Sequence, residues 1–410
     1  MTSPDPEAPA RPVPALLLQP YRPFFLCGAS YALLTVGFWF AWLEALRLGA
    51  PLPLAWNAPP GRVHALLMIW GVLTFYVFGF LLTAYVRWVQ AAPPSTTAVV
   101  RWIALLVVGH TAIVAGAFGP AGLLVPGGLL VLAALLGLIG FLGRAWWRSA
   151  APERLQPAVV LVALSLGALG LALALAGLRR GGSLYLAGIL LGSYGYLMLL
   201  LSSVGHRLVP FFTALRQGRQ SGTRRRGTLP VLGAGLALRA CVTALGDPDT
   251  ALRAAATIDG LLFAALAWEV SAWSPRETLR EPMIAVLYLA QVWLLLALAG
   301  SALSWLFPAR AALLDLPVLH ALAIGGLGTM VVGISTRVAL GHAGRPIEAD
   351  AWVLGVFAGV QAAALLRVGF ALAAPVWPAA GGLAHWAALP WCAAFALWLA
   401  RIGPVLARRP

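Results

Sequence analysis

Long runs of apolar residues recur along the whole chain, separated by short stretches that contain Pro, Gly or Arg. One of them, residues 61–90, reads GRVHALLMIWGVLTFYVFGFLLTAYVRWVQ. A helix needs roughly 20 apolar residues to cross a bilayer core that is about 30 Å thick. Since the 410 residues are 61% hydrophobic and only 10% charged, the sequence predicts an integral membrane protein.

Twelve such runs predict an all-α bundle of twelve transmembrane helices. Strands of a membrane β-barrel would be short and alternate in polarity, whereas these runs are continuous in Leu, Ala and Val. The predicted spans are Phe24 to Leu48, Val63 to Val86, Ala98 to Phe118, Ala121 to Leu142, Ala158 to Leu178, Ser183 to Val204, Leu229 to Leu245, Thr250 to Trp273, Pro282 to Phe307, Pro317 to Leu340, Ala351 to Ala374 and Leu383 to Leu406.

The positive charges predict the orientation of the chain. All 28 cationic side chains are Arg, and the formal net charge is +15. If the amino terminus is inside, 20 arginines fall on the inner side and six in the outer loops, while Arg239 and Arg367 lie within spans. Because inner loops are enriched in Arg and Lys, both termini are predicted to be cytoplasmic. The Arg-rich stretch 216–226 then fits contact with anionic membrane lipid, and binding of nucleic acid is not expected.

The chain is predicted to form one membrane domain, residues 24–410, after a cytoplasmic amino-terminal tail, residues 1–23. The tail is Pro-rich and has no short apolar core with a cleavage site, so the first span is expected to be an uncleaved anchor. A basic connection near residues 206–228 joins two halves of six spans each. The other loops are too short for a soluble domain with its own core.

Histidines near the outer ends of spans are the first candidates for a functional site. The predicted topology places His64, His320 and His385 at one depth, roughly 5 Å below the outer boundary, while His110 lies deeper. Neutral imidazole is a common metal ligand, and a haem accepts two axial histidines. The three rings could therefore meet around a metal ion or a haem, or they could hydrogen-bond separately to headgroups and carbonyls.

Small residues follow one of these histidines directly. Gly325, Gly326 and Gly328 would let a flat macrocycle approach the backbone after His320. Glycines of this kind also serve close packing between transmembrane helices. The sequence leaves both interpretations open.

Charged residues within the spans are costly and are therefore functional candidates. Arg239 and Arg367 could pair with the two propionates of a haem, because Arg binds carboxylates bidentately. Asp259, at a depth similar to that of Arg239, offers a structural ion pair as the alternative. Glu269, nearer the inner face, could extend to the interface or carry protons.

Three stretches of the chain form distinctive motifs: PYRPFFLCGA (20–29), with the second-span segment that ends GFLLTAYVRWVQ, then GHRLVPFFTA (205–214) and HALAIGGLGTMVVGISTRVALGHAGRP (320–346). Together they resemble the NnrS family, whose members are multi-span haem and copper membrane proteins of bacteria linked to the nitric oxide response, nitrosative stress and denitrification. The resemblance extends over nearly the whole chain. It implies a multi-pass protein of the bacterial cytoplasmic membrane.

The resemblance also implies particular ligands. His64, Met68 and Gly71 match the family's second-span motif, but Leu66 and Leu67 stand where the family usually has a second histidine and a glutamate. Copper therefore has less support than haem. The same segment resembles the second helix of haem-copper oxidase and nitric oxide reductase catalytic subunits, which implies that His64 and His320 are the axial ligands of a low-spin haem b.

Two motifs at the inner side complete the resemblance. They suggest either a second cofactor or substrate site that uses His342 and His206, or a charged helix terminus that holds the loops together. A gas-binding, five-coordinate haem would need a further ligand, for which His385 and His342 are both candidates. The matching residues are Arg207, Pro210 and Phe211 in one motif and Thr336, Arg337, His342 and Arg345 in the other.

The sequence thus predicts a haem-binding membrane protein of the nitric oxide response, with nitric oxide as its small-molecule ligand and an electron donor that stays open. Whether it catalyses a reaction is also open. A full proton-pumping oxygen reductase is not expected, because the chain lacks the three histidines on spans six and seven that hold the distal metal in those enzymes. The alternatives are a twelve-span transporter and a cofactor-free membrane partner of nitric oxide metabolism.

Overall fold

The computed structural model describes residues 14–409, apart from residues 221, 226, 246, 274, 275, 277, 278 and 308–310. Within these residues the fold is helical and contains no β-strand. The predicted all-α fold is therefore confirmed for the described part of the chain.

Eleven helical segments of the described chain are long and apolar enough to cross a membrane. A twelfth helix, α10 (Thr228–Leu245), lies where the seventh span was predicted, and its apolar stretch is shorter. The first six long segments are α1 (Tyr21–Arg47), Pro60–Trp88, α5 (Thr96–Phe118), Ala121–Trp147 with α6 (Leu124–Trp147), α7 (Leu155–Gly177) and Gly182–Arg216. The other five are α11 (Pro248–Ser271), α13 (Pro282–Leu306), Leu313–His342, α16 (Ala351–Ala373) and Pro378–Ala407 with α18 (Ala388–Ala407).

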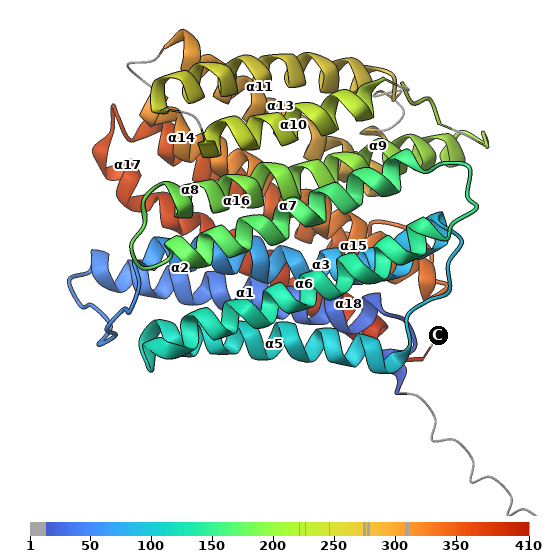
Figure 1. Cartoon of the computed structure of the whole chain (residues 1–410), viewed down its shortest axis with the longest axis horizontal. Helices are drawn as coiled ribbons and strands as arrows, with labels where there is room; N and C mark the ends of the chain where they lie inside the picture. Colours follow the sequence, from blue (N-terminus) through green and yellow to red (C-terminus); the bar gives the residue numbers. More distant parts are fainter. Residues whose placement is uncertain are drawn as a thin grey trace, which may run out of the picture.

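Three of these segments form the centre of the bundle and are more deeply buried than the others. They are Pro60–Trp88, Gly182–Arg216 and Leu313–His342, called the central segments below. The central segments contact one another, while α1 packs on α18, α5 on α6, α6 on α7, α11 on α13 and α16 on α18 around them. The contacts thus place the other helices around the central segments, and Figure 1 shows the helices running side by side along the bundle.

Each central segment changes from α-helix to π-helix part of the way along. The first consists of α2 (Pro60–Leu66), η2 (Leu67–Val72), α3 (Leu73–Phe80), η3 (Leu81–Tyr85) and α4 (Val86–Trp88). The second consists of α8 (Gly182–Leu190), η5 (Leu191–Met198) and α9 (Leu199–Arg216). The third consists of α14 (Ala311–His320), η7 (Ala321–Gly328) and α15 (Thr329–His342). The turns η2, η3, η5 and η7 are π-helical. Such turns are rare and frequently mark functional sites.

The two ends of the bundle differ in composition. The carboxyl terminus, the start of α1 and the connection between α9 and α10 lie at one end, on the right in Figure 1. We call this the basic end, because the connection carries the Arg-rich stretch 216–226. The opposite end, which contains His64, His320 and His385, is called the histidine end. The assignment of the basic end to the cytoplasm stays a prediction.

Glycines allow the closest helix contacts. A Cβ atom added at Gly188 in α8 would lie 2.5 Å from the backbone nitrogen of Ala174 and 2.6 Å from the carbonyl oxygen of Gly170, both in α7. Because these atoms belong to the backbone, no side chain can move aside. The packing of the α8–α9 segment against α7 therefore requires glycine at this position.

We predict that Gly188→Val destabilises the protein by about 1–3 kcal/mol or more, because overpacking forces the two helices apart. The measurement is the thermal midpoint of the detergent-solubilised protein, followed by size-exclusion chromatography. Gly143→Val is the matched control, since nothing lies within 4 Å of a Cβ at Gly143. Equal midpoints for the two variants would contradict the prediction.

Candidate functional site

Two histidines and one arginine converge at the histidine end. His64 lies in α2, His320 ends α14 and Arg367 lies in α16. Arg367 lies close enough to both imidazoles, and His64 to His320, for electrostatic interaction, and α14 packs on α16. All three side chains are partly buried. The structure therefore brings together the pair of histidines and one of the arginines that the sequence singled out.

The ring of His320 is held in one orientation. Its Nδ1 lies 2.8 Å from the carbonyl oxygen of Leu316. Since a carbonyl oxygen only accepts, Nδ1 carries the proton and donates, and Nε2 keeps a free lone pair. A histidine that ligates a metal commonly uses its second ring nitrogen in this way. His320 is thus prepared to act as a ligand through Nε2.

The ring of His64 is oriented by stacking. It lies parallel to the ring of Trp39 in α1, with centroids 4.4 Å apart and planes inclined by 16°. Stacking covers one face of the imidazole and leaves its edge, where both nitrogens lie, available. No hydrogen bond of this side chain is found among the described residues. The sequence did not point to Trp39, because the first helix contains several aromatic residues and nothing in the pattern sets this one apart.

Arg367 has no carboxylate partner among the described residues. Its guanidinium is partly buried, and no described acidic side chain lies near enough to compensate its charge. A charge within a membrane span ordinarily pairs with another group or faces a functional site. Arg367 is therefore a candidate to bind an anion, since the described residues offer its guanidinium no carboxylate.

The glycines after His320 serve helix packing. A Cβ at Gly325 would lie 2.3 Å from the Trp293 ring, and one at Gly328 would lie 2.8 Å from the Trp391 ring. At Gly326 the nearest atom, 2.4 Å away, belongs to Leu294. Side chains of α13 and α18 thus occupy the space that the sequence analysis considered for a macrocycle.

His385 has a partner of its own. Its Nε2 donates to Oε2 of Glu44 at 2.6 Å, and the same oxygen accepts from Nε1 of Trp386 at 3.2 Å. The other oxygen of Glu44 is paired with Arg47. The third histidine of the predicted layer therefore closes a polar cluster between α1 and the start of the last segment, and its Nε2 is engaged.

Arg239 and Asp259 form the buried ion pair that the sequence analysis considered as an alternative. Nε of Arg239 lies 3.2 Å from both carboxylate oxygens, and the Ser301 hydroxyl donates to Oδ2 at 2.5 Å. The guanidinium also covers the ring of Tyr194 at 3.3 Å. The predicted ion pair is confirmed. The carboxylate that pairs with Arg239 is thus Asp259 and not a haem propionate.

The basic end contains a cavity of about 170 Å³ between the first and third central segments. His342 borders it, with Nδ1 donating to the carbonyl oxygen of Val338 at 3.0 Å and with a buried Nε2 that has no partner among the described residues. The other lining residues are Phe80, Thr83, Ala84, Arg87, Trp88 and Val338. A small molecule could contact Nε2 of His342 there.

The remaining residues of the two inner motifs have separate surroundings. Arg207 pairs with Glu153 at 2.9 Å, and Arg337 lies over the ring of Phe212 at 3.9 Å. Arg345 is exposed. These contacts fit a charged helix terminus that holds the loops together. His206 is discussed below.

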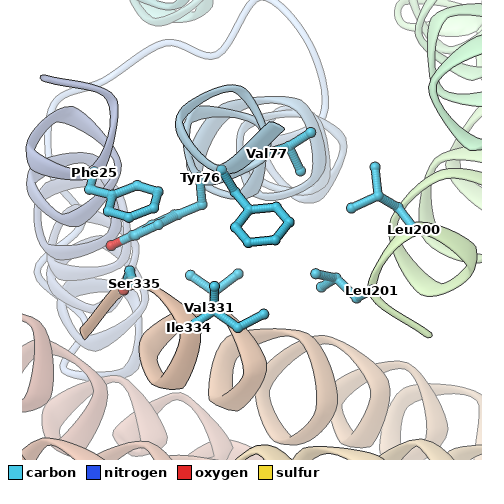
Figure 2. A pocket seen from close by; sticks show the side chains of 9 residues that line it. Phe25, Tyr76, Val77, Leu200, Leu201, Val331, Ile334 and Ser335 are labelled. Carbon is cyan, nitrogen blue, oxygen red and sulfur yellow. The ribbon is translucent and has the colours of Figure 1, made fainter. Parts of the chain in front are cut away.

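A second cavity lies among the central segments near the middle of the bundle (Figure 2). Its wall is almost wholly apolar, and the figure shows the rings of Phe25 and Tyr76 opposite Leu200 and Leu201. An apolar cavity excludes water but admits small apolar molecules. Such a space suits a diatomic gas.

His110 has a structural role that the sequence did not indicate. Its ring nitrogens lie 2.6 Å from the carbonyl oxygen of Leu106 and 2.9 Å from that of Trp70, which belongs to η2. Gly71 leaves space for the ring, since a Cβ there would lie 3.3 Å from Cδ2 of His110. The histidine therefore supports the π-helical turn that follows His64.

Comparison with known proteins gives one family. A family model described as NnrS protein matches residues 15–409. No curated protein matches the chain.

We predict that Asp259→Ala lowers the free energy of unfolding by about 3–5 kcal/mol, because it leaves a buried guanidinium unpaired. Thermal unfolding of the solubilised protein measures the effect. In the double variant Arg239→Met/Asp259→Leu, neither charge remains, and most of the stability should return. If the double variant were as unstable as the single one, the charge pair would not be the cause.

Proposed function

Because the chain belongs to the NnrS family, we propose that it is a haem-binding membrane protein of the nitric oxide response. His64 and His320 are its axial ligands, and the haem is of the b type. The three cysteines, Cys27, Cys241 and Cys392, stand far apart and form no Cys-x-x-Cys-His motif for covalent attachment. The bacterial cytoplasmic membrane is its proposed location.

One observation carries this proposal: two imidazoles and the guanidinium of Arg367 lie close enough to interact electrostatically, and none of the three has a carboxylate partner among the described residues. Iron accepts two neutral imidazoles, and a haem brings propionates that would compensate the guanidinium. The same group thus satisfies all three side chains. Neither cavity is lined by His64, His320 or Arg367. The support for a haem therefore comes from these three side chains.

The protein's own contribution would be orientation and charge. Leu316 fixes the tautomer of His320, and Trp39 fixes the plane of His64. Arg367 would hold a propionate and favour the reduced haem through its positive charge. A haem held by two histidines supplies one-electron transfer, and it binds a gas only after one ligand leaves.

Copper has less support in this chain. Leu66 and Leu67, at the positions discussed above, are buried in the apolar core with exposed fractions of 1% and 9%. Among the described residues no three His, Cys, Asp or Glu side chains are grouped as metal ligands. A transporter also has less support, because Arg239 and Asp259, two of the charges considered for its path, pair with each other.

We predict that His64→Ala and His320→Ala each abolish most of the low-spin haem signal in the absorption spectrum of the purified protein. The physical reason is the loss of one of two axial ligands. His385→Ala is the matched control, since its imidazole is at the same end but is bound to Glu44. If both ligand variants kept the wild-type spectrum, the assignment would be wrong.

We predict that Arg367→Leu lowers the midpoint potential of the haem and weakens haem retention, because a positive charge near the iron stabilises the reduced state. Arg367→Lys keeps the charge and should stay closer to wild type. Spectroelectrochemical titration measures the potential of each variant. Identical potentials for the Leu and Lys variants would show that Arg367 does not act on the haem.

A further inference from the structure

A row of buried polar side chains whose atoms make no hydrogen bond within the described residues extends inward from the basic end. The exposed fractions are 2% for Ser202, 0% for Ser203, 6% for His206 and 0% for Gln291. Both serine hydroxyls, both ring nitrogens of His206 and both amide atoms of Gln291 lack hydrogen-bond partners within the described part of the chain. Six orphaned polar atoms thus belong to four side chains.

Three of these side chains belong to α9, and the fourth rests against that helix. On α9, Ser202 and Ser203 precede His206 by four and three residues, which places them on adjoining parts of one helix face. A Cβ at Gly205 would lie 2.6 Å from Nε2 of Gln291, so the amide of α13 rests against the α9 backbone one residue from His206. The orphaned atoms therefore lie on or beside one short stretch of α9, residues 202–206.

Glu269 connects the group to the surface. Nε2 of His206 lies 3.6 Å from Oε1 of Glu269, a carboxylate with an exposed fraction of 0%. The other carboxylate oxygen accepts from the backbone N–H of Arg225 at 3.1 Å. Arg225 belongs to the Arg-rich stretch and is itself partly exposed. The row thus begins where the basic connection meets solvent.

The row reaches the middle of the membrane. Gln291 is the tenth residue of α13, which starts at Pro282 at the basic end. Nine residues of helix advance about 14 Å, roughly half the thickness of a bilayer core. On the α9 side, the apolar residues Leu200 and Leu201 of the central cavity immediately precede Ser202 (Figure 2). The polar lining therefore ends beside an apolar cavity.

Leaving these atoms unpaired would be expensive. Each buried polar group without a hydrogen bond costs about 1–3 kcal/mol, and lipid offers no partner. Internal water, which typically makes about three hydrogen bonds to groups of this kind, removes the cost. Adjacent hydroxyl, imidazole, amide and carboxylate groups are the polar partners that such waters need.

We propose that a chain of water molecules occupies this row and forms a proton-entry path from the basic end, through Glu269 and His206, to Gln291 at the middle of the membrane. Protons would enter this path from the basic end only, and the path would end at Gln291 without reaching the histidine end. It does not depend on the proposed haem, because none of its residues belongs to the histidine end.

Water contact at His206 tests the proposal directly. Solid-state NMR of the full chain in lipid, with ¹⁵N-labelled histidine, measures magnetisation transfer from water to each ring. The His206 signal is identified by its loss in His206→Gln. We expect rapid transfer to His206 and little to His110, which has an exposed fraction of 1% and both nitrogens on carbonyl oxygens. Transfer to His206 as slow as that to His110 would overturn the path.

A second measurement uses the unmodified protein and needs no signal assignment. Met330, with an exposed fraction of 1%, lies with its Cε 3.3 Å from the Cβ position of Gly205, beside the amide of Gln291. Hydroxyl radicals generated by X-rays from water in the row should oxidise it. In Gln291→Leu, which removes the polar partner, oxidation of Met330 should fall several-fold. Absence of oxidation in the wild type would contradict the proposal.

Discussion

Lipid offers no hydrogen bonds, so every polar side chain inside the bundle must find its partner within the protein, in water or in a ligand. This constraint orders the interior of the chain. Nε of Arg239 has Asp259, Nη2 has Ser301, His385 has Glu44, and the ring N–H of His110 donates to a backbone carbonyl oxygen. A function is inferred from side chains that keep a donor or acceptor atom without a hydrogen bond in the described part of the chain.

Those remaining groups gather at separate places along the three central segments and the helices beside them. His64, His320 and Arg367 lie at the histidine end, where a haem would satisfy them together. The row from His206 to Gln291 lies toward the basic end, where water would do so. An apolar cavity lies beside the inner end of this row. The proposed haem site, the proposed proton path and a space suited to a small gas thus occupy different parts of one bundle.

The π-helical turns show why part of the site could not be predicted from the sequence. The hydrophobic runs predict helices and their approximate limits, because a bilayer fixes their length. They do not distinguish a π-helical turn from an α-helical one, since a continuous apolar run is compatible with both. Yet η7 begins directly after His320, and His110 binds a carbonyl of η2 after His64. Likewise, the glycines after His320 were compatible with a cofactor until Trp293 and Trp391 were seen to fill the space.

By itself, the sequence determined the helical membrane class, the approximate number and limits of the helices, the family resemblance and the pairing of Arg239 with Asp259 as one of two alternatives. These follow from properties that are local in the chain or shared with a family. Only the tertiary structure decided which polar groups are satisfied. His385 meets Glu44 and Gln291 meets Gly205 across helices that are far apart in sequence, and such contacts depend on how the helices pack.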